Sequence, residues 1–304
     1  MSSSSYSAYV KSFFASDTSP SMQLSSWSSA SSYSEYVQSY FTSEPVLEET
    51  PEVLQEKLRE LRQEFSKTPP HHFSGDHPSF LSPEFLALFL RTEKFRVKAA
   101  AYRYRKYWEW RVRLFGDEAG RPFTAEKDRA ALELGFLKVV PGARDKEGRQ
   151  ILLANPGNLC RKTAGSVDQC RACWYLLHAA LEDPETAKTC SVVIIAACDT
   201  AKFSEFNSEF DRLAFSSLQG ALPVRVAAIY LLYVPSFFKH AWAVLSTLMT
   251  AKISSRAKML SGTPEAVRIS LLEVINADML PQEVGGPIAS DVKEWVQQRI
   301  AEGN

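Results

Sequence analysis

The chain of 304 residues is 45% hydrophobic and 23% charged, which provides enough apolar material for a sizeable core and excludes disorder over the whole length. Its 35 Lys and Arg balance 35 Asp and Glu, and this zero net charge argues against a general nucleic-acid binder. No stretch approaches about 18 uninterrupted apolar residues, and the N-terminus is a serine run instead of a basic region followed by an apolar one. We therefore expect a soluble cytosolic protein.

The first 45 residues differ in composition from the rest. Residues 1–45 contain eighteen serines and four charged residues, so we expect a disordered tail. An aromatic pattern with the spacing of one helical face nevertheless occurs twice, at 6–16 and 33–43. It is either low-complexity sequence with a chance or recent duplication, or a recognition element that folds against a protein groove or a membrane. A protein groove is favoured over a membrane, because Lys11 is the only cation in residues 1–45 and attraction to anionic lipids would be weak. The candidate partner-binding residues are Tyr6, Tyr9, Phe13, Phe14, Tyr33, Tyr36, Tyr40 and Phe41.

Residues 46–120 are predicted to form a helical lobe. Leucine spacing predicts a helix over 48–66, and Ser82 followed by Pro83 is typical of a helix start. A longer helix over 96–113 mixes basic and aromatic residues. It either binds nucleic acid or another acidic surface, or, as we favour, packs its aromatic side chains inward and lays its arginine stems along the surface. We expect the histidines in the loop at 71–77 to be solvated and not to bind a metal.

Short strand-like runs alternate with helical patterns over the remaining residues, 121–304. This alternation predicts an α/β fold with a mostly parallel sheet. The candidate strands are 136–140, 150–154, 191–198, 224–234 and 257–260. The candidate helices are 167–181, 204–218, 236–250, 263–275 and 290–301.

Motifs for catalysis and for metal binding are missing from the sequence. It contains no nucleotide-binding glycine motif, no G-x-S-x-G and no H-E-x-x-H, so we do not expect an enzyme. The five cysteines are expected to be free thiols, because Cys170 and Cys173 form a C-x-x-C without the second pair that a zinc site needs. We therefore expect neither a metal nor a cofactor.

The predicted helix over 236–250 is apolar on nearly all sides, which is typical of a helix that is buried, faces a membrane or closes over an apolar ligand. Lys252 and Arg256 follow it at a spacing that places both cations on one face. An apolar helix followed by paired cations suits a lid over a lipid that meets phosphate headgroups at a membrane.

Five motifs occur along the chain in one order. They are F-L-R-T-E-K-F at 89–95, D-K-E-G-R-Q-I-L at 145–152, L-Q-G-A-L-P-V-R-V at 218–226, Y-V-P-S-F-F at 233–238 and L-P-Q-E-V-G-G at 280–286. With these motifs, about residues 50–300 resemble the CRAL-TRIO lipid-binding family, in the branch that contains alpha-tocopherol transfer protein and cellular retinaldehyde-binding protein.

The resemblance implies a helical N-terminal lobe followed by a CRAL-TRIO lobe. There, a mostly parallel sheet would form the floor of an apolar cavity that a gate helix closes. The implied function is intracellular binding and transfer of one hydrophobic lipid, either tocopherol-like or retinoid-like or a phospholipid. The alternative is a lipid-sensing adaptor that docks a protein through the aromatic repeats. The candidate pocket residues are Trp174, Leu177, Leu181, Leu218, Ile229 and Leu231, and the candidate gate residues are Phe237, Phe238, Trp242, Leu245 and Met249.

The resemblance also implies a headgroup site. In the tocopherol-transfer branch four basic residues contact a phosphoinositide, and three of them have counterparts here in Arg225, Lys252 and Arg256. The fourth position is Ala227. The implied behaviour is release of the lipid at phosphoinositide-containing membranes during transient, peripheral association.

Overall fold

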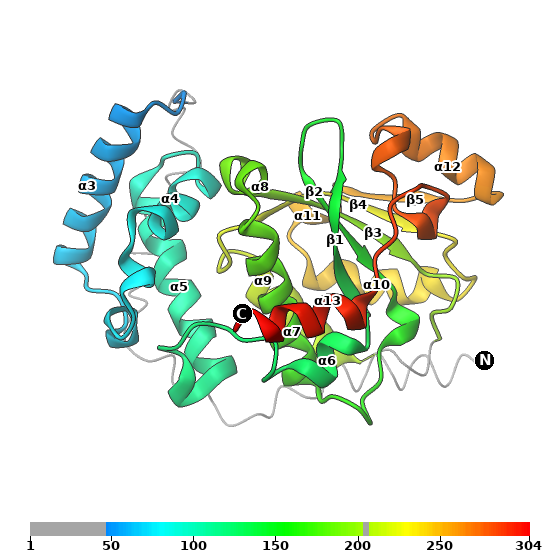
Figure 1. Ribbon diagram of the computed structural model, residues 1–304, viewed down its shortest axis with the longest axis horizontal. Coiled ribbons are helices and arrows are strands. Elements are labelled where there is room, and N and C mark those ends of the chain that lie inside the picture. The colour runs from blue at the N-terminus through cyan, green and yellow to red at the C-terminus, as the bar shows by residue number, and fades with distance from the viewer. Residues whose placement is uncertain (1–46, 203–206) are drawn as a thin grey trace.

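The computed structural model describes residues 47–202 and 207–304, so the serine-rich segment with its aromatic repeats lies outside the described residues. Figure 1 shows three helices at one end of the molecule, beside a larger body in which helices surround a sheet. The three helices are α3 (Pro51–Lys67), α4 (Pro83–Thr92) and α5 (Val97–Phe115). The prediction of a helical N-terminal lobe is confirmed, whereas its boundary near residue 120 stays a prediction.

Capping residues fix where two of these helices begin. The Thr50 hydroxyl accepts a hydrogen bond from the Val53 amide at 3.3 Å, and α3 begins at the next residue. The Ser82 hydroxyl accepts one from the Phe85 amide at 3.2 Å, and Pro83 takes the first helical position of α4. Each hydroxyl satisfies an amide that has no partner within the helix.

Helix α5 turns three of its aromatic side chains into the core, as favoured above, whereas Tyr102 and Trp110 are half-buried. Tyr104, Tyr107 and Trp108 are fully buried. The expectation of arginine stems on the surface is wrong for two residues, because Arg103 and Arg111 are buried as well. Arg111 donates to the Tyr107 hydroxyl at 2.5 Å, and this partner replaces the water that the guanidinium loses on burial.

The body contains a sheet with the strand order β1-β2-β3-β4-β5. Strands β1 and β2 are antiparallel, and the other neighbouring pairs are parallel. This arrangement confirms the predicted α/β fold with a mostly parallel sheet. The bounds are β1 (Leu137–Arg144), β2 (Gln150–Ala154), β3 (Ser191–Ala197), β4 (Arg225–Leu232) and β5 (Ala257–Leu260).

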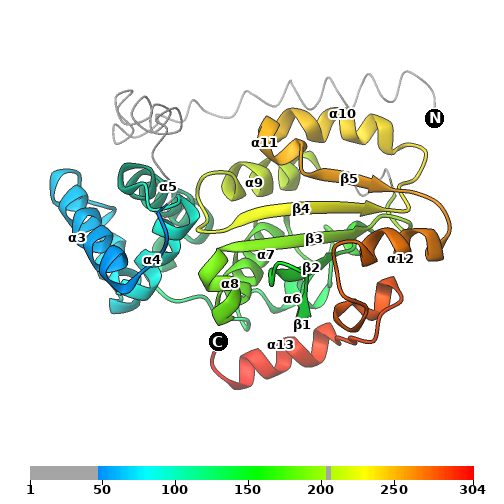
Figure 2. The ribbon, with the colours of Figure 1, turned by 90° about the horizontal axis from the view of Figure 1, so that it is seen from above.

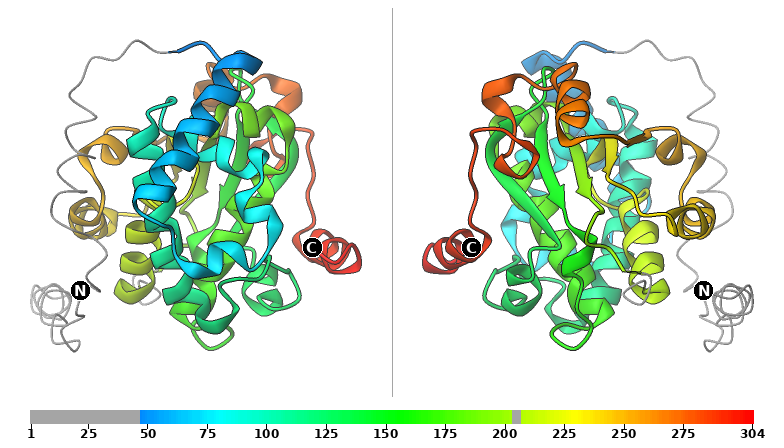
Figure 3. Two further views of the ribbon diagram at one scale, coloured as in Figure 1. Left: turned by 90° about the vertical axis from the view of Figure 1, so that its left-hand side faces the viewer. Right: turned by 90° about the vertical axis from the view of Figure 1, so that its right-hand side faces the viewer.

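Helices pack on both faces of this sheet. Figure 2 shows α9 and α10 side by side, and Figure 3 shows α10 and α13 on opposite sides of the molecule. The bounds are α6 (Arg129–Glu133), α7 (Ser166–Leu181), α8 (Pro184–Thr189), α9 (Ser208–Leu218), α10 (Phe238–Leu248), α11 (Ala251–Ser254), α12 (Pro264–Leu272) and α13 (Val292–Ala301). Short 3-10 turns lie at His72–Gly75, Pro78–Leu81, Gly116–Glu118, Pro156–Asn158, Ala277–Met279 and Gln282–Val284.

Successive side chains of a strand point to opposite faces, so the strands contribute to two cores. Val193 and Ile195 pack on one face against Val267 and Leu271 of α12. Val192 packs on the other face in a core that α7 and the N-terminal helices share. The face that carries Val192 is the one that positions the candidate site.

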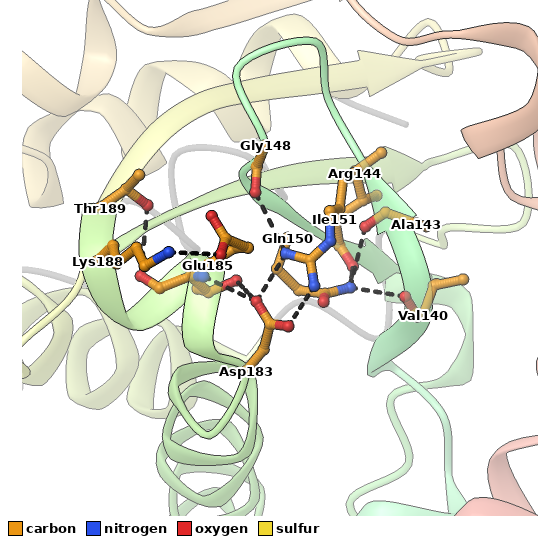
Figure 4. Close-up of polar contacts among 11 residues, drawn as sticks. Val140, Ala143, Arg144, Gly148, Gln150, Ile151, Asp183, Glu185, Lys188 and Thr189 are labelled. Carbon is orange, nitrogen blue, oxygen red and sulfur yellow. Dashed lines mark hydrogen bonds and ion pairs between the residues drawn. The ribbon is translucent and has the colours of Figure 1, made fainter.

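An ion pair joins the β1–β2 hairpin to the helices behind it (Figure 4). Arg144 at the end of β1 donates to both carboxylate oxygens of Asp183, and Asp183 also caps α8 by accepting from the Thr186 amide at 2.7 Å. These bonds hold the pKa of Asp183 down at about 2, with the Arg144 hydrogen bond as the largest cause. The side-chain amide of Gln150 on β2 donates to the Val140 carbonyl of β1 at 2.6 Å and so links the two strands of the hairpin.

Candidate functional site

An apolar cavity of about 240 Å³ lies between the sheet, α7, α9 and α10. Its floor consists of strand residues whose register brings them to one face: Ile194 pairs with Ile229, and Ala196 pairs with Leu231. Ala154 of β2 pairs with Ala196 and completes the floor. Two neighbouring alanines leave the space that larger side chains would fill.

Helix α10 covers the cavity. Phe238, Trp242, Leu245 and Met249 line it from one face of α10 and the residue after the helix. The rings of Phe238 and Trp242 stack with their centroids 6.0 Å apart, and Phe238 is buried. Four of the five predicted gate residues therefore line the cavity. Phe237 does not, because it precedes α10 as its N-cap residue.

The structure separates the six predicted pocket residues into two groups. Leu218, Ile229 and Leu231 line the cavity. Trp174, Leu177 and Leu181 lie outside this cavity, although the prediction placed them in it.

These three residues lie on the face of α7 that points toward the N-terminal helices. The Trp174 ring centroid is 5.3 Å from that of Tyr107, and its indole donates to the Ser217 hydroxyl at 3.0 Å. Leu177 lies beside α5 in a different cleft, and Leu181 lies near α4. Helix α7 instead presents Cys173 to the cavity.

Helix α9 supplies a wall of which the prediction named only Leu218. Phe210, Ala214 and Leu218 recur at helical spacing along the cavity, together with Phe215 and the carboxyl of Asp211. This spacing was present in the sequence and could have identified α9 as a wall. Asp211 breaks the pattern, because a carboxyl is unusual on an apolar face.

A second cleft, of about 600 Å³, lies between α5, the segment that connects α9 to β4, and α11. It brings Arg225 together with Lys252 and Arg256, which lie in a later segment of the chain, and α5 adds Arg103 and Lys106. We call this site the basic cleft. Leu218 lines both the apolar cavity and the basic cleft, so the two spaces adjoin.

The basic cleft carries clustered positive charge. Desolvation lowers the pKa of Lys252 and that of Arg225, and the proximity of Arg256 lowers both further. Arg225 donates to the Thr189 carbonyl at 2.8 Å, whereas its buried Nε has no hydrogen-bond partner within residues 47–202 and 207–304. Clustered cations and an unsatisfied donor are what an anionic group would stabilise.

Three ionisable side chains of α7 are in neutral forms. Burial lowers the pKa of His178 to about 3, so its imidazole is uncharged. Burial raises the pKa of Cys170 to about 11 and that of Cys173 well above its usual value, which removes the thiolate that a nucleophile needs. The described side chains thus offer no activated cysteine nucleophile at the cavity.

The loop histidines serve as short-range caps. His71 accepts from the Phe73 amide at 3.4 Å, and His77 accepts from the Ser79 amide at 3.3 Å. Among the described residues, no three His, Cys, Asp or Glu side chains are grouped so that they could hold a metal ion. The same residues include no helix that is long and apolar enough to span a bilayer.

Comparison with known proteins agrees with this geometry. Residues 136–286 match the CRAL/TRIO domain. The chain is 26% identical to Clavesin-2 of Homo sapiens over 260 residues, covering 83% of this chain and 75% of the relative. It is also 26% identical over 256 residues to the Alpha-tocopherol transfer protein-like protein of Mus musculus, covering 82% of this chain and 70% of that one.

The crystal structure of Sfh5 shares the fold. It superposes with a TM-score of 0.51 at 11% sequence identity, over 84% of this chain and 100% of that one. The matched domain begins just before β1 and ends at Gly286, so it contains the sheet, the cavity floor, α10 and the strand that carries Arg225. The resemblance drawn from the five motifs is confirmed, and the chain belongs to the CRAL-TRIO family.

Proposed function

We propose that the protein is a non-enzymatic cytosolic carrier, which holds one hydrophobic lipid in the cavity under α10 and exchanges it at membranes that contain phosphoinositides. The observation that carries this proposal is the adjacency of the two spaces. Leu218 borders both, and the segment that leaves the α10 cover continues into Lys252 of the basic cleft.

The apolar cavity explains the carrier step. Each methylene of a lipid exposed to water costs about 0.8 kcal/mol, and burial among side chains such as Ile194, Leu231 and Trp242 avoids this cost. Because α10 covers the cavity, movement of α10 would open a route by which the lipid can leave.

The basic cleft explains where exchange takes place. An anionic membrane surface attracts clustered cations, and a phosphoinositide phosphate accepts several charge-assisted hydrogen bonds. Binding of such a headgroup to Lys252 and Arg256 would bring α10 against the bilayer. The cover would then open into an apolar phase instead of water.

The test measures transfer of a fluorescent tocopherol analogue and of fluorescent phosphatidylcholine. Acceptor vesicles consist of phosphatidylcholine with or without phosphatidylinositol bisphosphate. The double variant Lys252→Ala/Arg256→Ala should transfer more slowly to the phosphoinositide vesicles, with unchanged binding of lipid. The control is Lys258→Ala, which removes an exposed cation on β5 outside the cleft.

Two results would overturn the proposal. Wild-type protein that takes up neither probe and carries no lipid in native mass spectrometry would contradict a carrier. A double variant that transfers as fast as Lys258→Ala would remove the phosphoinositide step and leave the carrier function intact.

A further inference from the structure

The carboxyl group of Asp211 lies in the apolar lining of the cavity. Asp211 lines the cavity from the first turns of α9, next to Phe210, Ala214 and Phe215. Its carboxyl has no hydrogen-bond or ion-pair partner within the described parts of the chain, 47–202 and 207–304. An acidic side chain in such a place is costly unless something pairs with it.

The polar groups nearest to Asp211 in sequence are already in use. The Asn207 amide oxygen accepts from the amides of Glu209 and Phe210, at 3.2 and 3.3 Å. The Asn207 nitrogen donates to the Ser166 hydroxyl at 2.9 Å, and that hydroxyl donates to Glu209 at 2.7 Å. This closed network caps α9 without Asp211, so the carboxyl is not needed to begin the helix.

The other polar side chains at the cavity do not neutralise Asp211. Lys202 borders the cavity, but its side chain is exposed. Cys173 and Cys198 are protonated, since burial raises the pKa of the first well above its usual value and that of the second to about 12. Burial likewise raises the pKa of Asp211 to about 7, because the surroundings disfavour a carboxylate. A carboxyl with this pKa can both donate and accept a hydrogen bond near neutral pH.

We propose that Asp211 anchors the polar end of the carried lipid, and that this lipid bears an uncharged hydroxyl group which exchanges hydrogen bonds with the carboxyl. The inference rests on the proposed carrier function and narrows the class of cargo. A fatty-acid carboxylate or a phosphate would bring a negative charge into an apolar space that already disfavours the charged form of Asp211. A pure hydrocarbon would leave the carboxyl unpaired, as it is without a ligand.

The test compares the lipids that co-purify with the full-length wild type, Asp211→Leu and Asp211→Asn in native mass spectrometry, followed by extraction and identification. Leucine has the same branching and the same number of side-chain heavy atoms but cannot form hydrogen bonds, whereas asparagine keeps both a donor and an acceptor. Uptake of retinol, retinyl methyl ether and retinoic acid is measured beside it through quenching of tryptophan fluorescence. Thermal unfolding shows whether each variant is folded.

The wild type should carry a hydroxyl lipid and prefer retinol over its methyl ether. Asp211→Leu should lose this lipid and bind retinol about tenfold more weakly, the equivalent of one well-formed hydrogen bond, while Asp211→Asn retains part of the affinity. If Asp211→Leu does not fold, the comparison of wild type with Asp211→Asn and the identity of the wild-type lipid decide.

Three outcomes would overturn the anchor while the carrier function stands. They are a wild-type lipid without a hydroxyl, a wild-type lipid whose polar end is anionic or an amine, and an unchanged lipid in folded Asp211→Leu. A wild type that binds no lipid at all overturns the carrier function, and the anchor falls with it.

Discussion

Lys106 forms part of the wall that α5 contributes to the basic cleft. The family position two residues after Arg225 is Ala227, so the cleft lacks one cation that the motif comparison implied. Lys106 reaches the cleft from a different lobe, and no motif in the sequence indicated it. Its ammonium is held 2.6 Å from the Glu109 carboxylate, which reduces the charge available to an anion.

We expect opposite changes from the two members of this pair. Lys106→Ala should weaken binding to phosphoinositide vesicles about fivefold, because one cation near an anionic surface contributes about 1 kcal/mol. Glu109→Gln should strengthen binding, because it releases the Lys106 charge. Vesicle sedimentation measures both effects, with Lys188→Ala on α8 as the control. If Glu109→Gln weakens binding as much as Lys106→Ala does, the ion pair stabilises α5 and its charge does not act on the membrane.

At the scale of elements, the Gln219 side chain joins the end of α9 to the end of α10. Its amide nitrogen donates to the Phe215 carbonyl at 2.9 Å and to the Leu248 carbonyl at 2.7 Å. Its amide oxygen accepts from the Thr250 amide at 2.5 Å. No side-chain cap is found at the N-terminal end of α10 among the described residues, and Gln219 is one polar attachment of the cavity cover.

Gln219→Ala should therefore speed the exit of lipid from the cavity. Gln219→Ala removes one hydrogen bond to Leu248 at the end of α10 and one to Thr250 just after it. At about 0.5–1.5 kcal/mol for each bond, the loss predicts at least several-fold faster transfer to phosphoinositide-free vesicles. Stopped-flow transfer of the fluorescent probes measures the rate. Ser246→Ala is the matched control, since its hydroxyl bonds only to Ala243 within α10. Equal rates for both variants would show that Gln219 does not hold the cover.

The ion pair in Figure 4 predicts a pH dependence of stability. The pKa of Asp183 falls from 3.8 unfolded to about 2 folded, so the folded state favours the carboxylate. Its contribution is therefore fully present above about pH 4 and is lost as the pH falls toward 2. Asp183→Asn keeps a capping oxygen and removes the charge that pairs with Arg144.

Urea denaturation should show that Asp183→Asn lowers the free energy of unfolding by about 1–2 kcal/mol at neutral pH, after allowance for partial solvent screening. The difference from wild type should shrink as the pH approaches 2. Asp117→Asn, which removes an exposed carboxylate, should differ little from wild type at any pH. A constant difference across the pH range would mean that shape, and not charge, explains the effect.

Elements were easier to predict than the faces they present. Strand-like runs and flanking turns predicted the bounds of β2 and β5. The family resemblance, and not strand periodicity, led to Ile229 and Leu231 of β4 as cavity residues. The sequence of α7 did not indicate which face meets the cavity, because residues 172–177 are all buried and apolar side chains extend around the helix. The side that meets the cavity depends on where α5 packs. That contact joins two lobes and leaves no periodic trace in the sequence.

At the scale of the whole molecule, the cavity and the basic cleft are built from residues 136–256 and from α5. The aromatic repeats at 6–16 and 33–43 lie outside the described residues. If they bind a protein partner, as predicted, their role is separable from lipid exchange. A membrane-binding role would instead change the exchange rate itself.

A full-length variant in which serine replaces the eight aromatic residues of the repeats distinguishes these roles. We expect its lipid binding and its transfer between protein-free vesicles to equal those of the wild type, because the cavity, its cover and the basic cleft are unchanged. A variant with eight tail serines replaced by alanine controls for altered composition. Slower transfer by the aromatic variant alone, with the same melting temperature, would mean that the repeats act at the membrane. The carrier would then extend beyond the CRAL/TRIO domain and its N-terminal helices.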